Sequence, residues 1–137
     1  MEKISILTAT SRAEDAEQIG VHLTGTPWAL VEIPQGQDAT AALKAASIPI
    51  LLLDSRLLET AGGSTWQVEL KKLAKTRRNA CVILLSNVTD QYLWDEVVQH
   101  GGFDVLTRPF KREQMLSTLL FAYAHCRTPW PKARQTG

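Results

Sequence analysis

Two unbroken apolar runs constrain the fold of this chain more than any other feature of its sequence. Residues 49–54 read PILLLD and residues 80–86 read ACVILLS, so each run is apolar up to a polar last residue. A short apolar run of this kind is typical of a strand that is covered on both faces, as in a parallel sheet. The two runs therefore predict central strands of a buried sheet.

Shorter strand-like segments alternate with amphipathic segments around these runs. Further strands are predicted at residues 4–7, 28–33 and 103–106, and helices at residues 13–23, 38–46, 65–78, 89–100 and 111–127. Strands joined by crossover helices are most simply parallel, and right-handed crossovers place helices on both faces. We therefore predict a doubly wound α/β fold with five parallel strands in the flavodoxin-like order 2-1-3-4-5, flanked by five helices.

Length and composition favour one domain that builds its core without a metal or a disulfide. The 137 residues fit a single domain, and 45% of them are hydrophobic. Residues 1–127 carry the alternating pattern, whereas residues 128–137 contain two prolines and no periodicity, so we expect a C-terminal linker or tail there. Cys81 and Cys126 lie far apart, outside any zinc-binding spacing.

Charge and hydropathy argue against several classes of function. The net charge of +1 offers no electrostatic basis for direct nucleic-acid binding. No apolar stretch approaches the roughly 18 residues of a membrane span, and the N-terminus does not resemble a signal peptide, so we expect no membrane association and a cytoplasmic location. A Gly-rich phosphate loop does not follow the first predicted strand, which leaves a flavin- or nucleotide-dependent enzyme as a remote alternative.

Polar side chains stand at the ends of the predicted strands. Thr8 follows the first strand, Asp54 and Ser86 end the two apolar runs, and Arg108 and Pro109 follow the last strand. In open parallel sheets the carboxyl ends of the strands meet at one edge, where ligands bind. The order of these residues resembles the receiver domain of two-component response regulators, in which an Asp follows the third strand, a Thr or Ser the fourth and Lys-Pro the fifth.

The resemblance covers about residues 3–127, and GGFDVLTRPFKREQML is especially similar to the family's fifth-strand region. It implies that Asp54 is at the phosphoacceptor position and that Ser86 and Arg108 are at phosphate-contact positions. It also implies that Val105 replaces the switch aromatic and that Pro109 follows a cis peptide bond. Receivers of this family accept a phosphoryl group from a histidine kinase with Mg²⁺ held by carboxylates. They act as signalling modules rather than enzymes, so we expect no catalytic residue.

The metal-binding residues of the family are the first departure. Thr8 and Ala9 stand at the positions of the acidic pair, and neither can hold a cation as a carboxylate would. Glu14 and Asp15 are the nearest acidic residues, but they fall in the first predicted helix and would need an unusual loop to reach the site. We therefore expect no resident metal or cofactor.

The lysine position is the second departure. Arg108 stands there, and because a guanidinium grips a carboxylate from two sides, we expect it to pair with Asp54 and to fill the space of Mg²⁺ and phosphate. Asn87 stands where the family usually has a small residue that leaves access to the aspartate, so it too would restrict access to Asp54. The sequence thus favours an atypical receiver that works by binding. In the alternative, Asp54 accepts a phosphoryl group from a histidine kinase and the site uses Mg²⁺.

Apolar residues on the last two predicted helices suggest a surface for partners. We expect an interaction face at Tyr92, Trp94, Met115 and Leu119, for a protein partner, an attached output domain, a sensor histidine kinase or a homodimer. The sheet-facing stripe of the last helix is expected to hold Leu116, Leu120 and Tyr123. The alternative is that both stripes belong to one wide core face.

Overall fold

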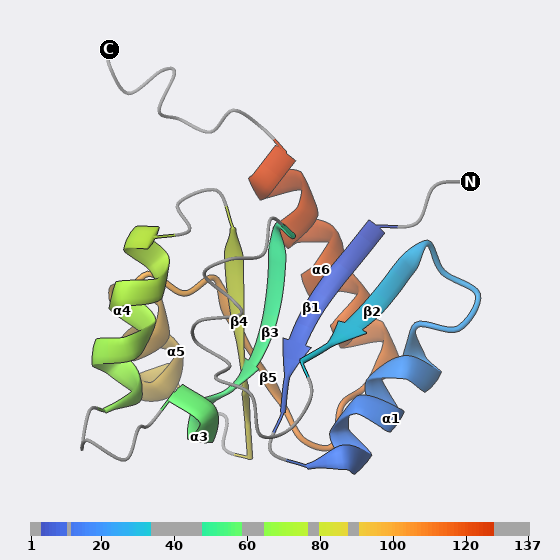
Figure 1. The fold of residues 1–137 in the computed structure, drawn as a ribbon, viewed down its shortest axis with the longest axis horizontal. Coiled ribbons are helices and arrows are strands. Elements are labelled where there is room, and N and C mark those ends of the chain that lie inside the picture. The colour runs from blue at the N-terminus through green and yellow to red at the C-terminus, as the bar shows by residue number, and fades with distance from the viewer. Residues whose placement is uncertain are drawn as a thin grey trace.

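The computed structural model describes residues 4–10, 12–33, 48–58, 65–76, 80–87 and 91–127. They form one parallel sheet of five strands in the order β2-β1-β3-β4-β5. Figure 1 shows helices on both of its faces. The strands are β1 (Ile4–Ala9), β2 (Trp28–Glu32), β3 (Ile50–Asp54), β4 (Cys81–Ser86) and β5 (Asp104–Thr107). The helices are α1 (Ala13–His22), α3 (Ser55–Leu58), α4 (Trp66–Thr76), α5 (Gln91–Gln99) and α6 (Arg112–Arg127).

The predicted fold class and strand order are confirmed. Four of the five predicted helices are present as α1, α4, α5 and α6. The fifth, predicted at residues 38–46, and the predicted tail at residues 128–137 lie outside the described residues. None of the described helices has the length and apolar character that a membrane span requires.

The short helix α3 lies between the predicted strand ending at Asp54 and the predicted helix at residues 65–78, where no helix was expected. It begins directly after Asp54, whose Oδ1 accepts a hydrogen bond of 3.0 Å from the backbone N–H of Arg56. A carboxylate in this position satisfies one of the free N–H groups of a first helical turn. Asp54 therefore ends β3 and caps α3, which holds one of its two oxygens in place.

The core consists of two apolar layers, one on each face of the sheet. The four residues of β3 that precede Asp54 are fully buried, and they alternate between the two layers because successive strand residues point to opposite faces. One layer packs under α1 and α6 and the other under α4 and α5, as the arrangement in Figure 1 shows. This double cover explains why β3 and β4 are unbroken apolar runs.

The inner face of α6 is wider than the predicted one: Leu116 and Tyr123 pack against the core layer as expected, which favours the alternative of one wide core face. Met115, Leu119 and Ala122 are fully buried in the layer under α1 and α6, whereas Leu120 is 59% exposed. The prediction that Met115 and Leu119 belong to an interaction face is therefore wrong. The stripes 115/119/122 and 116/120/123 have the same helical spacing, so periodicity alone could not choose between them. The edge-to-face contact of Trp28 with Tyr123 and the burial of Phe110 accompany the rotation that α6 adopts.

Candidate functional site

The carboxyl edge of the sheet brings the predicted site residues together. Asp54 ends β3, Ser86 ends β4 and Arg108 directly follows β5. The backbone N–H of Arg108 donates a hydrogen bond of 2.9 Å to the carbonyl oxygen of Ser86, which anchors the turn to the neighbouring strand. The peptide bond between Arg108 and Pro109 is cis, as the family resemblance implies.

The Arg108 guanidinium contacts two carboxylates at once. Its Nη2 donates to Asp54 Oδ2 at 2.8 Å, which is the expected contact. Its Nε donates to Asp15 Oδ1 at 2.9 Å and its Nη2 also donates to Asp15 Oδ2 at 2.7 Å. Nη1 donates to Asn87 Oδ1 at 3.2 Å. The two-sided grip of the guanidinium is therefore on Asp15, and Asp54 accepts one hydrogen bond from it.

Asp15 is the functional residue that sequence reasoning missed. We predicted that it would not reach the site, and this is wrong because α1 begins at the edge of the sheet and its first turn faces Arg108. Asp15 is the third residue of α1, and its side chain is only 3% exposed. The same stripe of α1 buries Ala16 and Ile19, and Ile19 lies one helical turn beyond Asp15. The four-residue spacing from Asp15 to Ile19 could have indicated that Asp15 lies on the buried face of the helix. A buried carboxylate needs a cationic or hydrogen-bonding partner, which Arg108 provides.

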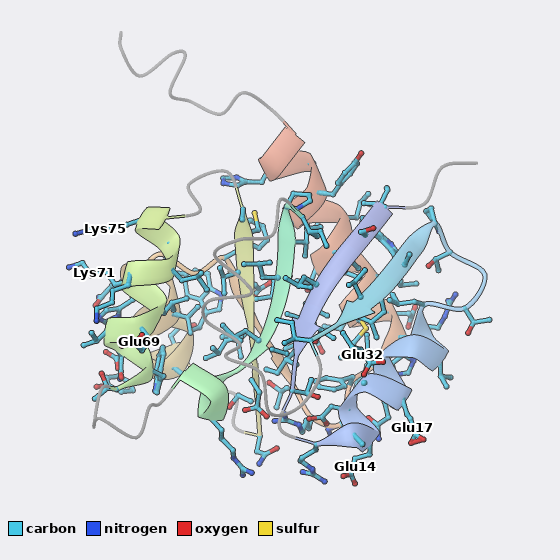
Figure 2. All side chains as sticks on the ribbon, viewed as in Figure 1. Glu14, Glu17, Glu32, Glu69, Lys71 and Lys75 are labelled. Atoms are coloured by element: carbon cyan, nitrogen blue, oxygen red, sulfur yellow. The ribbon has the colours of Figure 1, made fainter. Side chains whose placement is uncertain are left out.

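Glu14, unlike Asp15, pairs with Arg12 rather than with Arg108. It forms an exposed ion pair with Arg12, with 3.2 Å between Arg12 Nη2 and Glu14 Oε2. Figure 2 shows Glu14 and Glu17 pointing outward from α1. The N-terminal end of a helix favours negative charge, so both acidic residues of the first turn suit α1, but only Asp15 points inward.

The site carries an excess of one negative charge. Two carboxylates face one guanidinium, and the Arg108 side chain is only 13% exposed. Hydrogen bonding to Asp15 raises the pKa of Arg108 above its usual value, against the opposing effect of burial, and the charges of Asp54 and Asp15 raise it further. Arg108 therefore keeps its charge over the whole pH range in which a protein of this kind folds.

The residues present do not fit the Mg²⁺ ion that the family resemblance implies. Thr8 and Ala9 are buried at the acidic-pair positions, and the Thr8 hydroxyl donates to the carbonyl oxygen of Leu52 at 3.1 Å. Asp15 and Asp54 are both bound to Arg108. Among the described residues, no group of three or more His, Cys, Asp or Glu side chains could hold a metal ion.

The predicted switch position lies on the side of β5 that faces α4 and α5. Val105 is buried in the layer under α4 and α5, as an aliphatic residue rather than the aromatic one of the family pattern. Thr107 pairs with Ser86 in the sheet register, and the Thr107 hydroxyl is buried without a hydrogen-bond partner in the part of the chain that the structure describes.

A polar pocket of about 270 Å³ opens in front of Arg108. Its walls come from α1, from the turn after β5 and from the residue after β4, and Arg108 forms part of them. The lining residues are Arg12, Glu14, Asp15, Gln18, Asn87, Arg108 and Pro109. Asp54 is not among these residues, so solvent in the pocket meets the guanidinium rather than the Asp54 carboxylate.

The structure is similar to solved receiver domains over most of its length. The signal receiver domain of an HD domain-containing protein from Pseudomonas fluorescens Pf-5 matches with a TM-score of 0.75 and 17% identity, covering 98% of this chain and 95% of that one. The chain has the receiver-domain fold. The sequence itself matches no protein-family model and no curated protein.

Two further receiver structures extend this comparison. The beryllofluoride-activated NtrC4 receiver domain dimer matches with a TM-score of 0.72 and 15% identity, covering 89% of this chain and 98% of that one. NtrX from Brucella abortus matches with a TM-score of 0.73 and 16% identity, covering 91% of this chain but only 27% of that one. At these identities the likeness establishes the receiver fold, while the chemistry of the site depends on the residues described above.

The unequal grip of Arg108 predicts unequal effects of its two partners. Asp15→Asn should lower the free energy of unfolding by about 1.5–3 kcal/mol, because it replaces the carboxylate that accepts two hydrogen bonds from Arg108 with a neutral amide. Asp54→Asn should cost less, because it affects only one hydrogen bond from the guanidinium, and an asparagine side-chain oxygen can still accept the N–H of Arg56. Urea unfolding followed by circular dichroism measures both. Glu14→Gln, at the exposed neighbouring position, should cost less than about 1 kcal/mol, because it removes only an exposed ion pair and a favourable charge at the helix N-terminus. A larger loss in Asp54→Asn than in Asp15→Asn would contradict the assignment.

Proposed function

We propose that this chain is an atypical receiver domain that signals by binding a protein partner and does not need a phosphoryl group on Asp54. One observation carries the proposal: the buried Arg108 guanidinium bridges Asp15 and Asp54 and stands between Asp54 and the polar pocket. A carboxylate that is held in this way is a poor nucleophile. Its oxygen lone pairs already accept hydrogen bonds, one from Arg108 and one from the backbone of Arg56.

The charge of the site supports the same proposal. An incoming phosphoryl group carries several negative charges, and phosphoryl transfer depends on cations that neutralise them. The two carboxylates already exceed the guanidinium by one charge. The acidic-pair positions hold Thr8 and Ala9, which offer no carboxylate for a metal. A phosphoryl group would therefore enter a site of its own sign, and Arg108 would have to leave both carboxylates to receive it.

The surface beside β5 is where we propose that a partner binds. Both α5 and α6 pack against this edge strand. Tyr92 is 74% exposed on α5, and the Trp94 indole N–H donates to Asp104 Oδ1 of β5 at 3.2 Å while the ring stays partly exposed. Leu120 and Phe121 are exposed on α6. NtrX, of which this chain matches about a quarter, shows that such a domain can belong to a longer protein, so an attached output domain is one candidate partner.

The second candidate function is phosphorylation of Asp54 by a histidine kinase. Its support is the receiver fold itself, which places the Asp54 carboxylate at the carboxyl end of the central strand β3. The similar NtrC4 receiver is activated by beryllofluoride. In this reading the Arg108 bridge would open during the reaction.

Acetyl phosphate separates the two candidates. The protein is incubated with acetyl phosphate and Mg²⁺, and its intact mass is recorded under conditions that preserve acyl phosphates. We expect no added phosphoryl mass, with the NtrC4 receiver treated in parallel to show that the reagent is active. A single phosphoryl mass on the wild-type chain that disappears in Asp54→Asn would establish the second function and overturn the first.

A further inference from the structure

Two carboxylate oxygens converge on one nitrogen atom. Arg108 Nη2 lies 2.7 Å from Asp15 Oδ2 and 2.8 Å from Asp54 Oδ2. The two side chains come from different elements, α1 and β3, and they are 3% and 2% exposed. Like charges at this proximity repel each other strongly when they are buried, so the arrangement is stable only with a positive charge between them. In this chain the positive charge is part of the protein.

The surroundings of Nη2 have the chemistry of a site for a small hard cation. Both oxygens are carboxylate oxygens, and a third oxygen, Asn87 Oδ1, accepts a hydrogen bond from Nη1 of the same guanidinium. Divalent cations such as Mg²⁺ take oxygen ligands at about 2.0–2.1 Å and keep several waters. The polar pocket in front of Arg108 supplies room for such waters. Without the guanidinium, the local charge would change from one excess negative charge to two.

We propose that Arg108 is the internal counter-cation of a two-carboxylate site, and that a divalent cation and the Arg108 side chain compete for this one place between Asp15 and Asp54. The second carboxylate comes from the first turn of α1, not from the acidic-pair positions Thr8 and Ala9. The inference rests on the closed site of the proposed function. It explains why the wild-type site would exclude an external cation: the Arg108 guanidinium already occupies the place between Asp15 and Asp54.

Replacing Arg108 with a neutral side chain of similar length tests the proposal. Arg108→Met should bind Mn²⁺ with a dissociation constant on the order of 0.1–1 mM, as weak carboxylate sites do. Saturating Mg²⁺ or Mn²⁺ should raise its Tm by about 3–6 °C, because a ligand that binds only the folded state stabilises that state. The wild-type chain should show neither effect. Binding is read from the loss of the free Mn²⁺ resonance signal, and the Tm series is run at constant ionic strength.

Three variants serve as controls. In Arg108→Met combined with Asp15→Asn, or with Asp54→Asn, Mn²⁺ binding should weaken at least about tenfold, because each change removes one of the two charged ligands. Arg112→Met, at an exposed arginine of α6, should behave like the wild type. If Arg108→Met does not fold alone, recovery of its native circular dichroism by Mn²⁺ is the supporting result.

The outcomes that overturn the inference differ from those that overturn the proposed function. Equal Mn²⁺ binding by the wild type and Arg108→Met would show that the guanidinium does not compete. A folded Arg108→Met that binds no Mn²⁺, or a folded Arg108→Gln that binds none where the first variant does not fold, would show that the carboxylates form no cation site. Neither result depends on acetyl phosphate, so labelling of wild-type Asp54 remains a separate test.

Discussion

Replacing Arg108 with methionine is expected to lower the free energy of unfolding by about 3–5 kcal/mol in metal-free buffer. The substitution keeps most of the volume of the side chain but leaves Asp15 and Asp54 buried, close together and without their cation. Removing one partner from a buried ion pair costs far more than the pair contributes over neutral residues, because the remaining charge has lost its water and its counter-ion. Urea unfolding of the wild type and the variant in the presence of a chelator measures the difference.

A combined variant identifies the cause of that loss. Arg108→Met with Asp15→Asn and Asp54→Asn removes all three charges, and it should recover most of the lost stability because no uncompensated charge stays buried. Arg112→Met should change the stability by less than about 0.5 kcal/mol, as exposed substitutions usually do. A cost below about 1 kcal/mol for Arg108→Met alone would mean that solvent in the polar pocket screens the carboxylates.

Leu119→Ala is expected to destabilise the fold by about 2–5 kcal/mol, whereas Leu120→Ala at the next position should have a much smaller effect. Leu119 is fully buried in the layer under α1 and α6, so shortening it removes apolar contacts and leaves a cavity. Leu120 is 59% exposed, so shortening its side chain removes little buried apolar surface. The same urea experiment compares the two, and the ratio between them reports which stripe of α6 faces the sheet.

The opposite ranking would restore the prediction made from the sequence, in which Leu120 faces the sheet and Leu119 lies on an interaction face. Equal, large effects would indicate that a partner copy covers Leu120 in solution. Sedimentation of both variants and the wild type distinguishes this case, because a self-association that depends on Leu120 would weaken in Leu120→Ala only.

The elements of the sheet were predictable because their signals are local. The runs that became β3 and β4 carry their own evidence for burial on both faces, and parallel pairing with right-handed crossovers leaves few strand orders. The helix α5 likewise ends within one residue of its predicted end at residue 100, and Gly101 follows it with a positive φ of 96° that glycine adopts without strain. The rotation of α6 was not predictable in this way, since two adjacent stripes satisfied the same spacing.

In the candidate site, too, the residues whose signals are local could be predicted, and the one that depends on helix packing could not. Asp54, Ser86 and Arg108 could be placed at one edge from the sequence, because each follows a strand and the carboxyl ends of parallel strands coincide. The Arg108–Asp54 contact followed from that placement and from guanidinium chemistry. Asp15 could not be placed, because the position of a residue on a helix relative to a sheet edge depends on where the helix begins and how it packs.

By itself, the sequence determined the receiver-type fold and the absence of carboxylates at Thr8 and Ala9, since both depend on residue type and order along the chain. The tertiary structure alone decided that Arg108 gives its two-sided grip to Asp15 and only one hydrogen bond to Asp54. The physical reason is that charges separated by 93 residues interact only when folding excludes water around them and sets their distance. Folding therefore places the Arg108 guanidinium between two carboxylates, where it acts as their counter-cation.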